Sequence, residues 1–243
     1  MKPQVTPYKE TDSGKKDQVA EMFDNISDNY DFLNHFLSMG IDNLWRKKAI
    51  DQLKSIKPKT ILDVATGTGD LAVVALKRLA PESIVGIDIS EGMLNVGRKK
   101  MIRKKIADKI KMQYGDSEKI PFSDKSFDAI TVAYGVRNFE DLAKGLGEMC
   151  RVLKPGGKAV ILEFSKPKNF PVKQAFNLYF KNILPFIGKI VSKDNRAYTY
   201  LPESVDAFPE GNDFLAIFKA VGFKKVKQIK LSGGISSIYV GGK

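Results

Sequence analysis

Residues 60–79, TILDVATGTGDLAVVALKRL, decide the fold of this chain. The apolar run 60–66 predicts a buried strand, Gly67-Thr68-Gly69 predicts a turn, and residues 70–79 predict a helix. Glycines in such a turn let the backbone bend sharply and approach a ligand closely. The stretch therefore predicts the first strand, ligand-binding loop and helix of an α/β sheet.

Strands and helices alternate in the residues that follow this stretch. We expect strands at 83–89, 110–114, 129–134 and 158–164, with helices at 91–105 and 141–153. Pro155-Gly156-Gly157 predicts a stop and a turn before the fifth strand. Because such alternation requires parallel strands joined by crossover helices, the sequence predicts a doubly wound sheet.

The 243 residues are expected to form one domain with four parts. These are an N-terminal helical cap (1–57), a cofactor-binding core (58–165), a helical insertion that covers the substrate (166–200) and a C-terminal part (201–243). In the cap, apolar residues recur every three or four positions over 17–37, which predicts one helix face. In the C-terminal part, a helix at 212–221 and an antiparallel pair of strands at 224–231 and 236–240 are predicted.

Composition excludes several classes of site. The chain has one cysteine, Cys150, and one histidine, His35, so we expect no intramolecular disulfide and no metal site. No apolar run is long enough for a membrane-spanning helix. Residues 1–18 have neither the apolar core of a secretory signal nor the pattern of a transit peptide. These features predict a cytoplasmic protein.

The net charge of +12 is distributed unevenly. Residues 151–243 carry 16 Lys and Arg against 6 Asp and Glu, whereas residues 1–150 carry 24 against 22. Within the first part, RKKMIRKKIADKIK at 98–111 holds 8 basic residues and 1 acidic residue. Such surfaces attract phospholipid headgroups, nucleic acid or phosphorylated substrates, and a solvated lysine-rich helix face is the equal alternative for 98–111.

The loop after the first strand fits two cofactors. The NAD fingerprint GxGxxG/A is met by Gly67, Gly69 and Ala72. The S-adenosylmethionine loop has the form (D/E)xGxGxG, which the chain meets except at Ala65. The loop alone leaves both cofactors open.

Polar residues after the next strands favour the second cofactor. Asp88 ends the second strand, where a carboxylate can accept hydrogen bonds from both hydroxyls of a ribose. Asp63, just before the loop, can orient the loop or pair with a cofactor amino group. Asp116 and Ser117 follow the third strand and can bind an adenine amino group. Followed by RVLKPGGKAVILEFS at 151–165, this order of motifs is typical of methyltransferases that use S-adenosylmethionine.

Longer motifs make the chain resemble a known family, the ubiquinone/menaquinone biosynthesis C-methyltransferases. The resemblance runs from about residue 16 to the C-terminus and rests on YDFLNHFLSMGIDNLW (30–45), YGVRNFED (134–141), RVLKPGGKAVILEFS (151–165), SVDAFPE (204–210) and LSGGISSIYVG (231–241). The compact length is closer to the demethylmenaquinone methyltransferases of this family. Two positions depart from its pattern, because Leu33 stands where Met is usual and Asp42 where His is usual.

The resemblance implies a class I S-adenosylmethionine-dependent methyltransferase fold. This is a Rossmann-like doubly wound sheet, mostly parallel, with an antiparallel C-terminal strand. The implied reaction moves a methyl group from S-adenosylmethionine to a ring carbon of a polyprenylated quinol, most closely demethylmenaquinol. Thr68, Asp88, Asp116 and Ser117 fall on the family's cofactor positions, whereas Ala133 stands where relatives often have Ser. The expected cofactor-binding residues are Asp63, Gly67, Thr68, Gly69, Asp88, Asp116 and Ser117.

The implied chemistry needs a positioned ring and a proton acceptor. We expect Arg137 to orient the substrate oxygen or a water and to stabilise the developing phenolate, with an ion pair to Asp141 or Glu140 as the alternative. Tyr134 is expected to line the ring pocket, with core packing as its alternative. Glu163, at the end of the fifth strand, is a candidate proton acceptor or a strand-end hydrogen-bonding group.

A lipid surface is the expected partner beside the quinol. Aromatic residues and lysines are interleaved over 166–200, which suits contact with anionic lipid at the inner face of the cytoplasmic membrane; a simple cover over the sheet is the alternative. Tyr30 and Asn34 lie on the predicted N-terminal helix, and we expect this helix to close over the cofactor as a lid. The oligomeric state is left open between a monomer and a homodimer.

Three other functions remain to be compared with quinol methylation in menaquinone biosynthesis. A benzoquinol of the ubiquinone pathway is the first, because the family includes both branches. A nicotinamide-dependent oxidoreductase is permitted by Ala72. A nucleic-acid partner is suggested by the net charge, but long aliphatic residues among the aromatics at 170–186 do not form a base-stacking platform. We therefore expect no nucleic acid.

Overall fold

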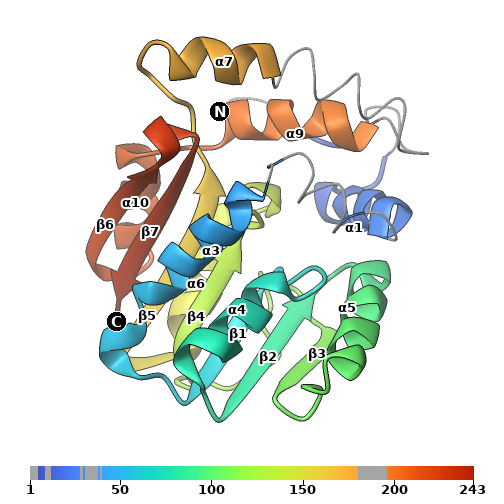
Figure 1. The fold of residues 1–243 in the computed structure, drawn as a ribbon, viewed down its shortest axis with the longest axis vertical. Helices are drawn as coiled ribbons and strands as arrows, with labels where there is room; N and C mark the ends of the chain where they lie inside the picture. Colours follow the sequence, from blue (N-terminus) through green and yellow to red (C-terminus); the bar gives the residue numbers. More distant parts are fainter. Residues whose placement is uncertain (1–4, 9–11, 28–29, 31–37, 39, 180–195) are drawn as a thin grey trace.

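A seven-stranded sheet organises the molecule, with the strand order β3-β2-β1-β4-β5-β7-β6 (Figure 1). The structure is a computed structural model that describes residues 5–8, 12–27, 30, 38, 40–179 and 196–243. The first five strands in this order are parallel, and β7 runs antiparallel to both β5 and β6. This topology confirms the predicted doubly wound sheet, and it places a crevice at the carboxyl ends of β1 and β4, where the strand order reverses.

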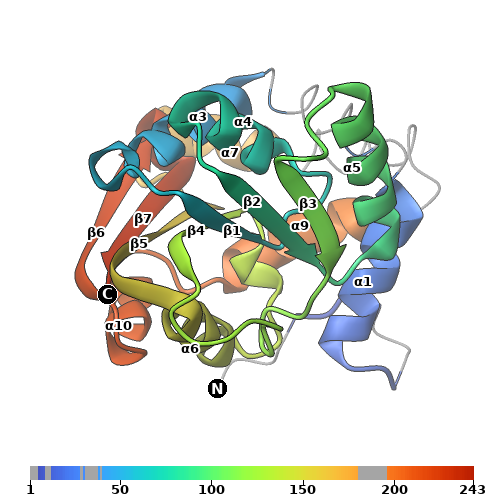
Figure 2. The same ribbon diagram turned by 90° about the horizontal axis from the view of Figure 1, so that it is seen from below.

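Helices cover both faces of the sheet. The strands are β1 (Thr60–Val64), β2 (Ser83–Asp88), β3 (Ile110–Tyr114), β4 (Phe127–Ala133), β5 (Leu153–Phe164), β6 (Lys224–Leu231) and β7 (Ser236–Gly242). The helices on the faces are α3 (Ile41–Asp51), α4 (Asp70–Leu79), α5 (Glu91–Arg103), α6 (Leu142–Val152) and α10 (Asn212–Ala220). Figure 2 shows α3, α4 and α5 on one face, with α6 and α10 on the other.

Each face of the sheet has its own hydrophobic core. Successive side chains of a strand point to opposite faces, so Leu62 and Val64 of β1 pack on the α6 and α10 side. Ile61, which precedes Leu62, packs on the α3 and α4 side together with Trp45. The alternation of β1 therefore fixes which helices lie on which face.

A third group of helices lies across the carboxyl edge of the parallel strands (Figure 1). It consists of α1 (Lys15–Ile26), α7 (Val172–Leu178) and α9 (Arg196–Ala207). Met22 of α1, Phe176 of α7 and Tyr200 of α9 belong to one small core. The N-terminal cap and the insertion, far apart in sequence, thus pack against one another above the sheet. In the described part of the chain, no helix is long and apolar enough to cross a bilayer.

Most predicted elements of the core occupy the expected residues. The helix at 70–79 and the strand at 110–114 have the predicted bounds. The helix predicted over 17–37 begins at Lys15 and ends at Ile26. Asn34 and the rest of 31–37 lie outside the described residues, as do residues 180–195 of the insertion with Phe180 and Phe186. α9 begins in the predicted insertion and continues past residue 200.

The predicted stop at Pro155-Gly156-Gly157 is corrected by the structure. β5 begins at Leu153, directly after α6, and its register against β4 jumps from the Phe127–Leu153 pair to the Ala129–Lys158 pair. The three residues therefore form a bulge inside the strand, and Gly156 supplies its left-handed φ of 80°. A Pro-Gly-Gly run has the same sequence pattern in a bulge inside a long strand as in a turn between two elements.

We expect Gly157→Ala to destabilise the fold by about 2 kcal/mol or more. A Cβ at Gly157 would lie 2.7 Å from the backbone oxygen of Asp128 and 2.9 Å from that of Lys154, and backbone atoms cannot move aside cheaply. The control is Gly147→Ala in α6, where a Cβ meets nothing within 4 Å and should stabilise by about 0.5–1 kcal/mol. Urea unfolding of both variants measures the difference, and equal midpoints would contradict the packing argument.

Candidate active site

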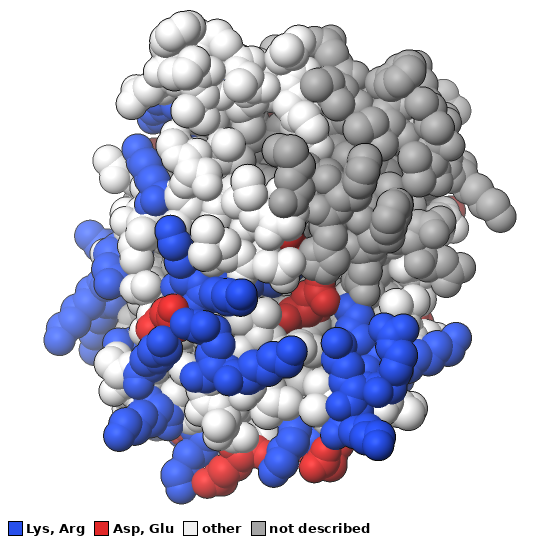
Figure 3. Space-filling view, in the orientation of Figure 1, with Lys and Arg blue, Asp and Glu red and all other residues white. Residues whose placement is uncertain are grey.

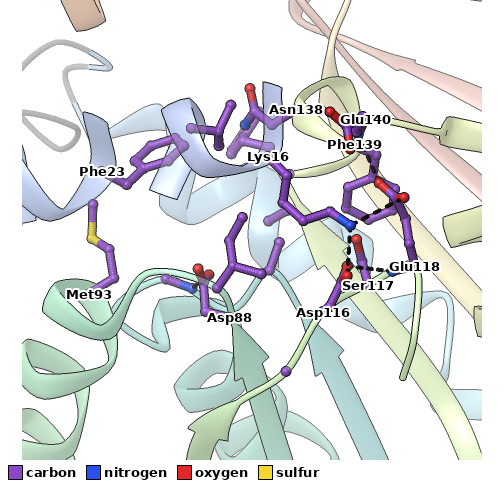
Figure 4. Close-up of a pocket in the computed structure, with 18 of the residues that line it drawn as sticks. Lys16, Phe23, Asp88, Met93, Asp116, Ser117, Glu118, Asn138, Phe139 and Glu140 are labelled. Carbon is purple, nitrogen blue, oxygen red and sulfur yellow. Dashed lines mark hydrogen bonds and ion pairs between the residues drawn. The ribbon is translucent and has the colours of Figure 1, made fainter. Parts of the chain in front are cut away.

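A cavity opens at the carboxyl ends of β1 to β4, beneath α1 (Figure 4). Its empty volume is about 660 Å³, including space that is open to solvent. Gly67, Asp88, Asp116 and Ser117 of the predicted set line it, and so does Tyr134. The structure thus brings together residues from four separate strand ends in one crevice.

The loop after β1 is shaped by residues with left-handed φ angles. Ala65, Gly67 and Gly69 have φ of 50°, 56° and 84°. Ala65 stands where the S-adenosylmethionine pattern has its first glycine, and its left-handed φ shows why glycine is favoured there. A Cβ added at Gly67 would meet no atom within 4 Å, so its α carbon faces open space in the cavity. The loop therefore presents bare backbone to a ligand.

Asp88 ties this loop to the second strand. Its Oδ2 accepts the Gly67 N–H (2.7 Å) and its Oδ1 accepts the Ser90 N–H (2.9 Å). Burial raises the pKa of the carboxyl group. Each carboxylate oxygen keeps lone-pair capacity for a further donor. Asp88 is therefore placed to accept the two hydroxyls of a ribose in the cavity.

The far end of the cavity carries the predicted adenine-binding residues. The Asp116 Oδ1 accepts the Glu118 N–H (2.8 Å), and its Oδ2 accepts the ammonium of Lys16 (2.7 Å). Figure 4 shows Lys16 reaching from α1 across the cavity to this carboxylate, with Ser117 beside it. An adenine amino group at Asp116 would share this carboxylate with Lys16 or displace its ammonium.

α1 is fastened over the cavity at both of its ends. Lys15 donates to the carbonyl oxygens of Arg137 (3.1 Å) and Phe139 (2.9 Å), and burial lowers its pKa to about 8. Asp24 accepts the Ser90 hydroxyl (2.6 Å) and the Gly92 N–H (2.8 Å) at the start of α5. Sequence analysis missed both anchors, since their partners are 66 or more residues away and no local motif marks them.

Three predicted cofactor-binding residues, Asp63, Thr68 and Gly69, do not line the cavity, and the first two support the loop from behind. The buried Thr68 hydroxyl accepts a hydrogen bond from Lys100 (2.9 Å). The buried Asp63 carboxylate accepts the hydroxyls of Thr66 and Thr131, each at 2.6 Å. Of the two roles considered for Asp63, these contacts favour orientation of the loop.

The carboxyl group of Asp63 should make stability depend on pH. Burial raises the pKa of Asp63 to about 6, whereas an unfolded Asp titrates near about 3.9. Between these values the folded state binds the proton and the unfolded state does not, so the contribution of Asp63 to stability falls as pH rises from about 4 to about 6. The total change should be about 2–3 kcal/mol.

Asp63→Asn removes this titration while its amide can still hydrogen-bond both threonines. Urea unfolding between pH 4 and pH 7 should show that the difference in unfolding free energy between wild type and variant changes across this window. Parallel curves for the two proteins would show that the carboxyl group titrates normally.

Arg137 lies beside the cavity in a buried ion pair. Its Nη1 donates to the Glu163 Oε1 (2.9 Å) and to the carbonyl of Tyr134, while its Nε donates to the Ser204 hydroxyl of α9 (3.3 Å). Glu163 is fully buried and also accepts the N–H groups of Arg137 (3.3 Å) and Phe164 (2.8 Å). The partner of Arg137 is thus Glu163, and the predicted alternatives, Asp141 and Glu140, are wrong. These contacts favour Glu163 as the anchor of Arg137 over a free proton acceptor.

Tyr134 stands at the cavity wall with an unusual backbone. Its φ is 59°, and its ring packs on Phe164 with centroids 4.5 Å apart. Its buried hydroxyl meets no partner with full hydrogen-bond geometry among the described residues; the hydroxyl of Ser236 lies near it and donates to the carbonyl of Glu163 (2.9 Å). Burial raises the pKa of Tyr134, so its hydroxyl is neutral and can donate. Left-handed φ outside glycine is strained and often marks functional sites.

The cavity fits S-adenosylmethionine in order along its length. Asp116 and Ser117 suit the adenine, Asp88 suits the ribose, and the bare backbone at Gly67 leaves room for the sulfur-bearing tail. Tyr134, directly after β4, lines the cavity, and Arg137 follows three residues later, just outside the lining.

Comparison with known proteins gives a consistent result. The model of the ubiE/COQ5 methyltransferase family matches residues 10–243. The chain is 51% identical to a demethylmenaquinone methyltransferase of Bacteroides fragilis, over 98% of this chain and 97% of the relative. It is 48% identical to the ubiquinone/menaquinone biosynthesis C-methyltransferase UbiE of Geotalea uraniireducens, over 97% of this chain and 100% of the relative.

Solved structures with the same fold include more distant proteins. A putative S-adenosyl-L-methionine-dependent methyltransferase of Methanococcus maripaludis superposes with a TM-score of 0.59 at 23% identity, covering 97% of each chain. A SAM-dependent methyltransferase of Aquifex aeolicus has a TM-score of 0.55 at 20% identity, covering 75% of this chain and 81% of that one. These similarities concern the fold, and they agree with the predicted class I architecture.

Proposed function

The chain belongs to the ubiE/COQ5 methyltransferase family, and from this membership we propose that it methylates a ring carbon of demethylmenaquinol. The methyl donor is S-adenosylmethionine, whose sulfonium carries an activated methyl group. Relatives named demethylmenaquinone methyltransferase favour a naphthoquinol head. A benzoquinol of the ubiquinone branch is the second candidate, because other relatives carry the combined name.

We propose that the quinol head binds beside Arg137, because three buried polar atoms there have no hydrogen-bond partner in the described part of the chain. Among the described residues, four buried side-chain polar atoms lack a partner, and three of them are the Tyr134 hydroxyl, the Asn138 Oδ1 and the Tyr200 hydroxyl. Buried polar groups are normally satisfied, so an unsatisfied cluster indicates a missing ligand or water. A quinol offers two hydroxyl groups to such a cluster. The guanidinium of Arg137 supplies the positive charge for the oxygen that becomes phenolate.

Each step of the methyl transfer can be matched to one of these residues. The ring carbon forms a bond to the methyl group, the sulfur–methyl bond breaks, and the ring then loses one proton to become aromatic again. We propose that Arg137 stabilises the phenolate, that Asn138 accepts a hydrogen bond from a phenol or a water, and that Tyr134 donates one. Burial raises the pKa of Tyr200 to about 12, which also keeps this hydroxyl neutral and able to donate. The proton leaves through water to bulk solvent.

Mass spectrometry of quinones from a strain that lacks this chain tests the proposal. Accumulation of a naphthoquinone one methyl group lighter than the normal product is the expected result. A benzoquinone one methyl lighter would support the second candidate, and an unchanged quinone profile would reject both. A plasmid that restores the chain should restore the normal profile.

We further propose that the α7 end of the molecule contacts anionic lipid. Phe170, just before α7, and Leu178, the last residue of α7, are 81% and 59% exposed. Figure 3 shows Lys and Arg gathered over the lower half, whereas the α7 end is mostly uncharged. We therefore propose apolar insertion at α7 as the mode of contact, in place of attraction to the large basic surface.

Phe170→Ser combined with Leu178→Ser should abolish sedimentation with phosphatidylglycerol vesicles. Ile102→Ser on α5, where the side chain is 68% exposed, is the matched control and should leave sedimentation unchanged. Equal binding by all three proteins would contradict contact through α7. A homodimer formed by the same exposed end is the alternative, and light scattering of the lipid-free protein would reveal it.

A further inference from the structure

Behind the glycine loop lies a buried group of charges that we call the loop cluster, formed by Asp42, Arg46, Asp70 and Lys100. Arg46 and Lys100 are each only 6% exposed. Arg46 pairs with Asp42 through Nη1 and lies 3.7 Å from Asp70 through Nη2, while Lys100 bonds Asp70 at 2.8 Å. Asp42, Arg46 and Lys100 are buried and Asp70 is half-buried. Burying charges is costly unless each serves packing, pairing or a ligand.

Three of these residues have evident structural tasks. Lys100 holds both the Thr68 hydroxyl and Asp70, so it fastens α5 to the loop. Asp42 accepts the hydroxyl of Ser38 (2.8 Å) as well as the guanidinium of Arg46. Lys100 also lies in the basic run 98–111, for which the sequence predicts either a solvated helix face or an anion-binding surface.

Arg46 is different because one of its donors is unused. Its Nε is buried and is the fourth side-chain polar atom without a partner in the described part of the chain. Hydrogen bonds to a guanidinium are stronger than neutral ones, and an unmade one costs correspondingly more. A missing partner that accepts from a buried guanidinium is most simply an anion.

Arg46 lies next to the start of α4, because its Nη2 is 3.7 Å from Asp70, which directly follows Gly69 of the loop. Arg46 is within electrostatic range of Asp63, beneath the loop, and of Tyr134, on the cavity wall. Among the described residues that line the cavity, Lys16 alone is a cation, and its ammonium bonds Asp116 at the adenine end. Beside this part of the cavity Arg137 already donates through Nη1 and Nε to Glu163, Tyr134 and Ser204, so Arg46, whose Nε is unused, is the better placed donor to a negative group.

We propose that Arg46 binds the α-carboxylate of S-adenosylmethionine. This inference rests on the assigned cofactor and extends it to a residue outside the predicted set. The amino-acid tail lies beyond the ribose, so Asp88 and Gly67 direct it towards the β1 and β4 loops. There Arg46 offers its Nε–H, held in place by Asp42 and by the nearby Asp70.

Two ligands that differ only in the carboxylate test this assignment. Calorimetric titration measures the affinity of S-adenosylhomocysteine and of its decarboxylated analogue, which keeps the amino group. Arg46→Lys keeps a positive charge beside Asp42 but has no Nε at that position. We expect it to bind S-adenosylhomocysteine about 30-fold more weakly, which corresponds to about 2 kcal/mol, and to bind the analogue as wild type does.

Asp42→Asn is the matched control. It weakens the same ion pair but keeps the guanidinium, so the preference for the carboxylate should remain. A double variant, Arg46→Gln with Asp42→Asn, keeps the cluster neutral if Arg46→Lys folds poorly. Equal losses for both ligands would show that Arg46 only positions the loop, and no loss for either would also overturn the inference. A wild-type protein that binds neither thioether would overturn the cofactor assignment itself.

Discussion

Arg137→Lys is expected to lower turnover about 100-fold to 1,000-fold while leaving the affinity for S-adenosylhomocysteine essentially unchanged. Lysine keeps one positive charge and can still pair with the fully buried Glu163. It lacks the planar fork through which Arg137 contacts Glu163, Tyr134 and Ser204 with two different nitrogens. A lysine ammonium that pairs with Glu163 has no second nitrogen that could donate to the phenolate oxygen of the substrate.

The measurement is methyl transfer to a demethylmenaquinol at saturating cofactor. Arg78→Lys is the control, because Arg78 makes a comparable two-pronged contact with Asp51, both atoms at 2.8 Å, on the exposed part of α4. That variant should keep wild-type turnover. If Arg137→Lys retains more than a fifth of the activity, Arg137 serves the fold alone and its proposed role in catalysis is wrong.

The loop and strands of the core could be predicted because their signals are local. Residues 60–79 contain the whole strand, turn and helix, and the structure places α4 at the predicted residues 70–79. Asp88 could be placed in the cavity for the same reason, since it ends a strand that pairs in parallel with β1. A residue at the carboxyl end of such a strand lies at the crevice whatever the rest of the chain does.

The partners of the site residues could not be predicted in this way. Glu163 meets Arg137 because β4 and β5 pair with Ala133 opposite Leu162, and this register is not written in either strand alone. Lys16 meets Asp116 across 100 residues through the docking of α1. Such contacts depend on tertiary packing, which sequence periodicity does not encode.

Asp88→Asn is expected to weaken binding of S-adenosylhomocysteine by about 100-fold or more. Two hydrogen bonds from ribose hydroxyls to a carboxylate contribute about 3 kcal/mol together, and each 1.4 kcal/mol is about tenfold in affinity. The amide also turns one acceptor into a donor, which then faces the N–H of either Gly67 or Ser90. The substitution should weaken the ribose contact and disturb the loop geometry. Calorimetric titration measures the combined loss of affinity for S-adenosylhomocysteine.

Asp128→Asn separates this effect from a general loss of stability. Asp128 also accepts backbone N–H groups, those of Lys59 (3.0 Å) and Thr60 (2.8 Å), but it does so at the amino ends of the strands. Its hydrogen bonds with Lys154 and Thr60 lower its pKa to about 2 despite the opposing effect of burial, so the charged form stabilises the fold at neutral pH. Asp128→Asn should therefore lower the unfolding midpoint and keep cofactor affinity. If the two variants lose affinity equally, the ribose is not held by Asp88, and the order of contacts along the cavity has to be reassigned.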